Sequence, residues 1–231
     1  MPWDNVLGVA LITGLIGLAI LIVLWPGEKQ GKRLLVRWGV PDPDAGEVML
    51  AVRYLKRRRF WYPWLFLALP PLVDDTGPGS LFATLLLGGL IAELLAQRPS
   101  RGPRREADLV PRTLLGIVPA WMLVLGVLAV AGAITHLALT AQWKLLAVAA
   151  GAAVICAAIT LLAVRRPAVG GPRVDLALRR RSTRVAIGLG IGACTSIGWP
   201  GGDFGSLLAV VAGLAAFLAV TAPVKRQPAV A

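Results

Sequence analysis

The side chain best suited to chemistry is Glu93, a carboxylate near the inner end of a long apolar run. An ionisable group inside such a run is costly to bury, and it often marks a proton or ion pathway. Arg98 follows closely in the sequence. Two interpretations therefore stay open: a proton or cation site at Glu93, or a carboxylate that snorkels to the surface or pairs with an arginine.

Other polar side chains lie near the ends of the apolar runs. Asp74, Asp75 and Asp203 fall in short turns rich in Gly and Pro. They would form a weak cation site if these turns converge, and ordinary turn chemistry explains them equally well. His136 is the single histidine and lies near the end of a run. We expect it at a membrane interface rather than in a metal site.

Motifs that would indicate catalysis or a cofactor are missing from the sequence. Cys156 and Cys194 lie inside apolar runs without a CxxC spacing, which predicts small packing residues. The chain contains no P-loop, no H-E-x-x-H and no G-x-S-x-G, and its acids form no metal-binding pattern. No apolar run carries the polar stripe of a channel lining. We therefore expect neither an enzyme nor a cofactor-binding protein.

A glycine-rich stretch at 188–193 fits the pattern G-x-G-x-x-A. It fails as a dinucleotide fingerprint because no strand precedes it and no acid follows at about 20 residues. Small residues one helical turn apart instead predict close helix packing, within one chain or between chains. The candidate packing residues are Gly188, Gly192, Gly205, Ala209 and Gly213.

The elements that carry these residues are predicted to be membrane helices. Of the 231 residues, 57% are hydrophobic and only 16% are charged, and the mean hydropathy is +0.73. A soluble fold of this size could not cover so much apolar surface. The composition therefore predicts an all-α, polytopic transmembrane bundle of about seven spans. The apolar runs lie at about 5–25, 60–73, 80–97, 113–135, 144–164, 185–199 and 204–222.

The distribution of positive charge predicts the topology. The net charge is +12, and every Lys and Arg except Lys144 falls in three connecting segments or in the tail. Because cytoplasmic loops retain Lys and Arg, the N-terminus is predicted outside and the C-terminus inside a bacterial cytoplasmic (plasma) membrane. The expected organisation is an anchor helix (1–25), a basic cytoplasmic segment with an interfacial amphipathic helix (26–59), hairpin 1 (60–97), a basic linker (98–112), hairpin 2 (113–164), a second basic linker (165–184), and hairpin 3 with a short tail (185–231).

The basic segments are the candidate contact surfaces. Asp44 and Glu47 have the spacing of a capping box, so a helix is expected over about 45–59. Its apolar positions suit an interfacial anchor, or alternatively a docking surface for a cytosolic partner. Topogenic retention explains the charge, so no nucleic-acid partner is expected. The candidate contacts to anionic lipid headgroups or a protein partner are Arg57, Arg58, Arg59, Arg179, Arg180 and Arg181.

Three short segments carry a resemblance. They are Val52-Arg53-Tyr54-Leu55 before a basic run, Trp61-Tyr62-Pro63-Trp64-Leu65, and Ala177-Leu178-Arg179-Arg180-Arg181-Ser182. Each resembles segments of uncharacterised polytopic membrane proteins of high-GC Gram-positive bacteria, a resemblance that implies no activity. From the residues we expect a non-enzymatic membrane subunit or accessory protein that binds another chain or a second copy of itself. The alternative is a transporter or transporter component, coupled to an ATPase on a separate chain.

Overall fold

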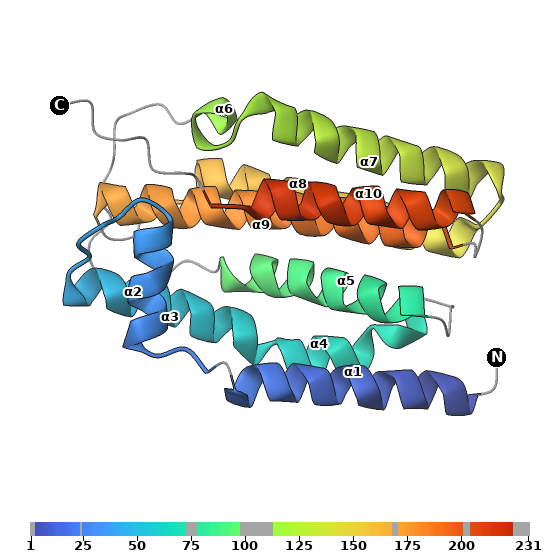
Figure 1. Ribbon diagram of the computed structural model, residues 1–231, viewed down its shortest axis with the longest axis horizontal. Coiled ribbons are helices and arrows are strands. Elements are labelled where there is room, and N and C mark those ends of the chain that lie inside the picture. Colours follow the sequence, from blue (N-terminus) through green and yellow to red (C-terminus); the bar gives the residue numbers. More distant parts are fainter. Residues whose placement is uncertain are drawn as a thin grey trace.

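The computed structural model describes residues 3–23, 25–72, 78–97, 113–167, 171–200 and 204–223. Over these residues the chain forms ten α-helices and one short 3-10 helix, without strands. Most of the helices lie side by side along the long axis of the molecule, and α2 lies across one end (Figure 1). The helices are α1 (Trp3–Val23), α2 (Glu28–Arg37), α3 (Ala45–Phe60), α4 (Tyr62–Ala68), η1 (Pro70–Leu72), α5 (Pro78–Ala96), α6 (Leu114–Ile117), α7 (Ala120–Leu139), α8 (Trp143–Arg165), α9 (Pro172–Gly198) and α10 (Phe204–Thr221).

Within the part of the chain that the structure describes, three helices are long and apolar enough to cross a membrane, namely α7, α8 and α10. Part of α1 together with α2 meets the same requirement as a pair that bends by 96°, which would make a fourth. The all-helical class is thus confirmed for the described residues. The other predicted spans fall on α1, on α4 with η1, on α5 and on the second half of α9, which are not among the three. Helix length and composition therefore do not establish seven spans or the orientation of the termini.

The central element is α9, which packs against α5, α7, α8 and α10. Its residues from Ala186 to Cys194 are all buried. Gly198 allows α9 and α7 to approach closely, because it has no Cβ atom. A Cβ added at this position would lie 2.9 Å from the Ala133 Cα atom of α7. The 27 residues of α9 also include much of the predicted second basic linker. Residues 172–184 are therefore not a loop, and they form the first half of this helix.

A second core lies at the basic end of the molecule. It joins α2 and α3 to the first half of α9 through the buried side chains of Leu35, Val52, Leu55, Val174 and Leu178. We call α2, α3 and Pro172–Arg184 of α9 the basic head.

The helix predicted over 45–59 is present as α3. Asp44 Oδ1 accepts a hydrogen bond from the Glu47 N–H at 2.7 Å, and the Asp44 N–H donates to Glu47 Oε2 at 3.0 Å. These two contacts form the predicted capping box. However, Val48, Val52 and Leu55 are at most 8% exposed and contact protein. The apolar face expected to lie on lipid is therefore part of the basic-head core.

Two other predicted runs are interrupted by proline. The run at 113–135 divides into α6 and α7, with Pro119 between them as the N-cap of α7. The run at 60–73 consists of the seven-residue α4 and then η1, which begins at Pro70. Proline lacks the N–H that continues a helix, so both interruptions have a local cause.

Candidate functional site

Glu93 lies at the centre of a buried polar cluster that joins three helices. Its side chain on α5 is fully buried. Arg58 of α3 places its Nε atom 2.9 Å from Glu93 Oε2 and forms an ion pair. The Tyr54 hydroxyl of α3 donates to Glu93 Oε1, and the Ser182 hydroxyl of α9 donates to the same oxygen at 2.6 Å. Oε1 therefore accepts two hydrogen bonds, whereas Oε2 has the ion pair with Arg58 and no hydrogen bond among the described residues.

Two further side chains complete this cluster. Gln97, one turn after Glu93, donates from Nε2 to Ser182 Oγ at 2.6 Å. Arg181 of α9 donates from Nη1 to the Tyr54 hydroxyl at 2.5 Å, and its guanidinium carbon lies 5.0 Å from the centre of the Tyr54 ring. We call Tyr54, Arg58, Glu93, Gln97, Arg181 and Ser182 the Glu93 cluster.

Burial favours the neutral phenol of Tyr54. Burial raises the pKa of Tyr54, so its hydroxyl keeps its proton and donates a hydrogen bond to Glu93 Oε1. The arrangement is suited to binding α3, α5 and α9 together.

Arg179 is the most completely buried arginine of the basic head, at 1% exposure. Its Nε donates to Asp175 Oδ2 at 2.6 Å, and Asp175 is itself buried. Its Nη1 donates to the carbonyl of Ala163, and its Nη2 donates to those of Arg166 and Pro167 at 2.7 and 3.1 Å. Arg179 therefore satisfies carbonyl groups at the end of α8, which the helix itself leaves unpaired.

Two more helix ends are closed by side chains from a neighbouring helix. Arg184 donates from Nε to the Val220 carbonyl near the end of α10 at 2.9 Å, and its guanidinium carbon lies 5.5 Å from the centre of the Trp38 ring. At the opposite end of the bundle, His136 Nδ1 lies 2.7 Å from the Gly198 carbonyl, and its ring stacks on Trp199. His136 thus contributes to the junction of α7 and α9.

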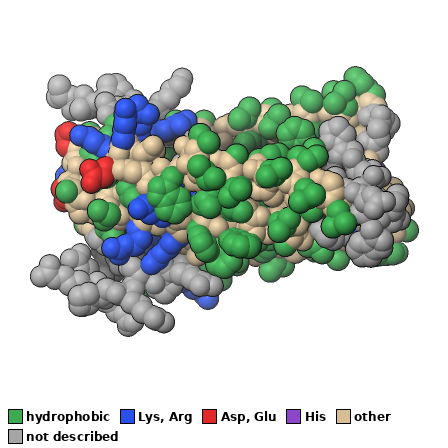
Figure 2. Space-filling view, turned by 90° about the horizontal axis from the view of Figure 1, so that it is seen from below, with side chains coloured by type: hydrophobic (Ala, Val, Ile, Leu, Met, Phe, Trp, Pro, Cys, Tyr) green, Lys and Arg blue, Asp and Glu red, His purple; other side chains and the backbone are tan. Residues whose placement is uncertain are grey.

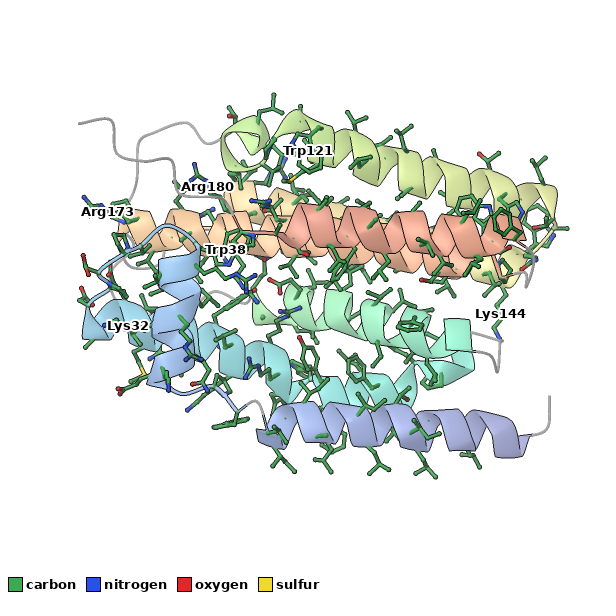
Figure 3. All side chains as sticks on the ribbon, viewed as in Figure 1. Lys32, Trp38, Trp121, Lys144, Arg173 and Arg180 are labelled. Carbon is green, nitrogen blue, oxygen red and sulfur yellow. The ribbon has the colours of Figure 1, made fainter. Side chains whose placement is uncertain are left out.

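The structure separates the predicted contact arginines into different environments. Arg58 and Arg179 are engaged inside the chain. Arg57, Arg59, Arg180 and Arg181 are half-buried. Figure 3 shows Arg180 at the same end of the molecule as Lys32 and Arg173, with Lys144 at the other end.

Most of the predicted packing positions face other helices of the same chain. The position of Gly188 faces Thr221 and Phe217, and that of Gly192 faces Leu86. Gly213 packs against the Thr195 side chain. Ala209 is half-buried and Gly205 is exposed.

Several predicted features lie outside the described residues. They are Asp74, Asp75 and Asp203, the linker 98–112 including Arg98, and the basic residues of the tail. The arginine that pairs with Glu93 in the structure is Arg58, which precedes Arg98 in the chain by the whole of hairpin 1.

A cavity of about 370 Å³ lies between α7, α8 and α9. Its lining includes Gly126, Cys156, Gly190 and Ile191, and the hydroxyl of Thr160 is bonded to the Ala157 carbonyl at 2.7 Å. Ligand sites usually add several convergent polar groups to an apolar wall. The described lining is apolar, so it suits hydrocarbon better than a polar ligand. Within the described ranges, no group of three or more His, Cys, Asp or Glu residues could hold a metal ion.

The sequence interpretation missed the partners of Glu93, although the sequence contains a usable signal. Tyr54 and Arg58 are four residues apart on one helix, as are Glu93 and Gln97 on another. Side chains at i and i+4 share a helix face, so each pair presents two polar groups in one direction. Asp175 and Arg179 have the same spacing. Nothing in the spacing tells which of these faces meet.

Comparison with protein-family models, with curated proteins and with solved structures finds no match for this chain. Over the described residues, the fold supports the class of an all-helical protein with three helices long and apolar enough to span a membrane.

Proposed function

We propose that this chain is a non-enzymatic integral membrane subunit or accessory protein. In this role the membrane bundle supports the basic head, and the basic head binds a partner chain with an acidic surface, or a second copy. The observation that carries the proposal is the use of the polar groups. The buried charged side chains Glu93, Arg179 and Arg184 join helices of the same chain, whereas a row of exposed cations faces outward from the basic head.

The exposed row lies on α2. Its cations recur at helical spacing and are all exposed, whereas Gly31, Leu34 and Leu35 on the other side are buried. Glu28 is the acidic residue of the first turn. The row consists of Lys29, Lys32, Arg33 and Arg37. A single-sign row of this kind favours encounter with a negatively charged partner.

We further propose seven membrane crossings, with the N-terminus outside and the basic head inside a bacterial cytoplasmic membrane. The course of the chain supports this, because α1, α4 with η1, α5, α7, α8, α9 and α10 run alternately along the long axis (Figure 1). Figure 2 supports it as well, since the Lys and Arg side chains gather at one end and hydrophobic side chains cover much of the remaining face. Cytoplasmic placement of a basic end follows from the positive-inside rule.

The contacts of Glu93 weigh against the transporter alternative. A transport site must exchange its ligand, and both oxygens of this carboxylate already have partners on α3 and α9. Releasing them would break the polar contacts that join these three helices.

The test uses the full-length chain, extracted from its native membrane with a mild detergent and measured by native mass spectrometry. The proposal expects a complex heavier than one chain, with either a defined second protein or a second copy. Replacing Lys32 and Arg33 by Glu should reduce the complex at least tenfold, while Lys144→Glu at the opposite end leaves it unchanged. A monomer without a copurifying chain would contradict the proposal, as would equal loss in both variants.

A further inference from the structure

The basic head carries more positive charge beside the Glu93 cluster than its carboxylate can balance. Glu93 faces Arg58, with Arg181 one hydrogen bond further away through Tyr54. Arg59 follows directly on α3, and its Nη1 atom is buried without a hydrogen-bond partner among the described residues. Burial, with the nearby guanidinium groups of Arg58 and Arg181, lowers the pKa of Arg59. A partly buried cation in this setting is stabilised by a nearby anion.

A row of exposed apolar side chains follows these arginines along the same stretch of chain. Trp61 keeps helical backbone angles (φ −84°, ψ −15°), so the end of α3 continues into α4. Along this continued helix Phe60, Trp64 and Leu67 follow at i, i+4 and i+7 and are 49%, 59% and 46% exposed. They form one exposed apolar ridge that begins directly after Arg59.

Arginines followed by a ridge of aromatic and aliphatic side chains suit a ligand that has an anionic group at one end and hydrocarbon at the other. Tryptophan and arginine are enriched at the headgroup level of a membrane. A guanidinium group binds a phosphate through paired N–H donors. An amphiphile with an anionic phosphate and hydrocarbon chains would meet Arg59 with its headgroup and the ridge with its chains.

We propose that Arg59 and Arg181 bind the phosphate of an anionic phospholipid of the inner leaflet, whose acyl chains lie along Phe60, Trp64 and Leu67. Arg58 stays paired with Glu93, and Arg181 bridges this pair to the lipid through Tyr54. The site depends on the membrane placement of the chain. It does not depend on the proposed partner, because the lipid binds the isolated chain.

The test measures lipid binding by the purified full-length chain in detergent, by native mass spectrometry and by thermal unfolding. The probes are phosphatidylglycerol, zwitterionic phosphatidylcholine and inorganic phosphate. Phosphatidylglycerol should bind and raise the unfolding temperature, whereas the other two should not. Arg59→Gln and Arg181→Gln should each weaken phosphatidylglycerol binding about fivefold, which is the effect of one surface arginine on an anionic membrane.

The control is Arg173→Gln, which removes an exposed cation from the outer end of the basic head (Figure 3), away from the ridge, and should change binding less than twofold. Arg59→Lys retains the charge should Arg59→Gln fail to fold, and it should still prefer phosphatidylglycerol to phosphatidylcholine. Equal effects of the two lipids would overturn the proposal. Stabilisation by inorganic phosphate alone would also overturn it, since the site would then bind a free anion. Because the purified chain has no partner bound in this assay, the lipid-binding result does not depend on the result of the native-complex experiment.

Discussion

Neutralising Glu93 should destabilise the protein substantially. Glu93→Gln keeps the size of the side chain and one oxygen for Tyr54 and Ser182, and it removes the charge that faces Arg58. Removing one partner of a buried ion pair costs about 3–5 kcal/mol, because the other charge stays buried alone. The Arg58 side chain is 15% exposed and can recruit some water. We therefore expect the lower end, about 3 kcal/mol.

The corresponding shift is measurable by thermal unfolding in detergent. For a chain of this size, 1 kcal/mol corresponds to about 2–4 °C, so Glu93→Gln should unfold about 6–12 °C earlier. Arg58→Gln should have a similar effect, because it leaves the fully buried carboxylate without its cation. The control Arg53→Gln, on the exposed side of α3, should shift the free energy of unfolding by no more than about 0.5 kcal/mol.

The double variant tests whether the ion pair is the cause. If it is, Arg58→Gln with Glu93→Gln should cost about as much as either change alone, with a coupling energy of about 2–3 kcal/mol. Additive losses would refute the reasoning, since the two residues would then act independently. A rise in stability for Glu93→Gln would refute it differently. Residues held in strained sites for function often stabilise a protein when they are replaced, and this result would favour the transporter alternative.

Three further predictions follow from helix ends, close packing and topology. Arg179→Lys keeps the charge but loses the planar guanidinium group that reaches both Asp175 and the end of α8. The free energy of unfolding, measured by denaturant titration, should therefore fall by about 2–3 kcal/mol. Gly198→Ala should cost about 1–3 kcal/mol because its Cβ would meet the Ala133 backbone, whereas Gly151→Ala, with open space around it, should be neutral or slightly stabilising in the same titration. Thr140→Cys, in the turn after α7, should react with an impermeant thiol reagent in intact cells, whereas Lys32→Cys should react only after permeabilisation. Reaction of both from one side would contradict the proposed orientation.

The sequence predicted the helical class and the local signals well. The capping box at Asp44 and Glu47 needs only residues that are close in the chain, so spacing alone was enough to place α3. The apolar composition was enough to predict helices able to span a membrane, of which three are present. Local hydrogen bonding and hydropathy are properties of a segment, and a single segment reveals them.

The sequence did not predict the contacts that depend on two segments distant from each other in the chain. Amphipathic α3 has the pattern of a helix on a lipid surface, but α2 and α9 cover its apolar side. Pattern alone cannot distinguish a face covered by lipid from one covered by protein, because both are apolar. The same reason explains Glu93, whose partner comes from a helix that precedes it by a whole hairpin arm rather than from the adjacent linker.

The arginines of α9 show how one residue type serves two purposes within a single helix. Arg179 points into the protein and closes the end of α8, whereas its neighbour Arg180 is half-buried at the basic end (Figure 3). Successive residues on a helix lie about 100° apart, so a run of arginines necessarily points in several directions. The positive-inside rule counts all of them alike, although only those outside the core can meet a lipid or a partner. A basic run in a membrane protein is therefore evidence of topology first, and its contribution to binding depends on which helix faces the bundle has already covered.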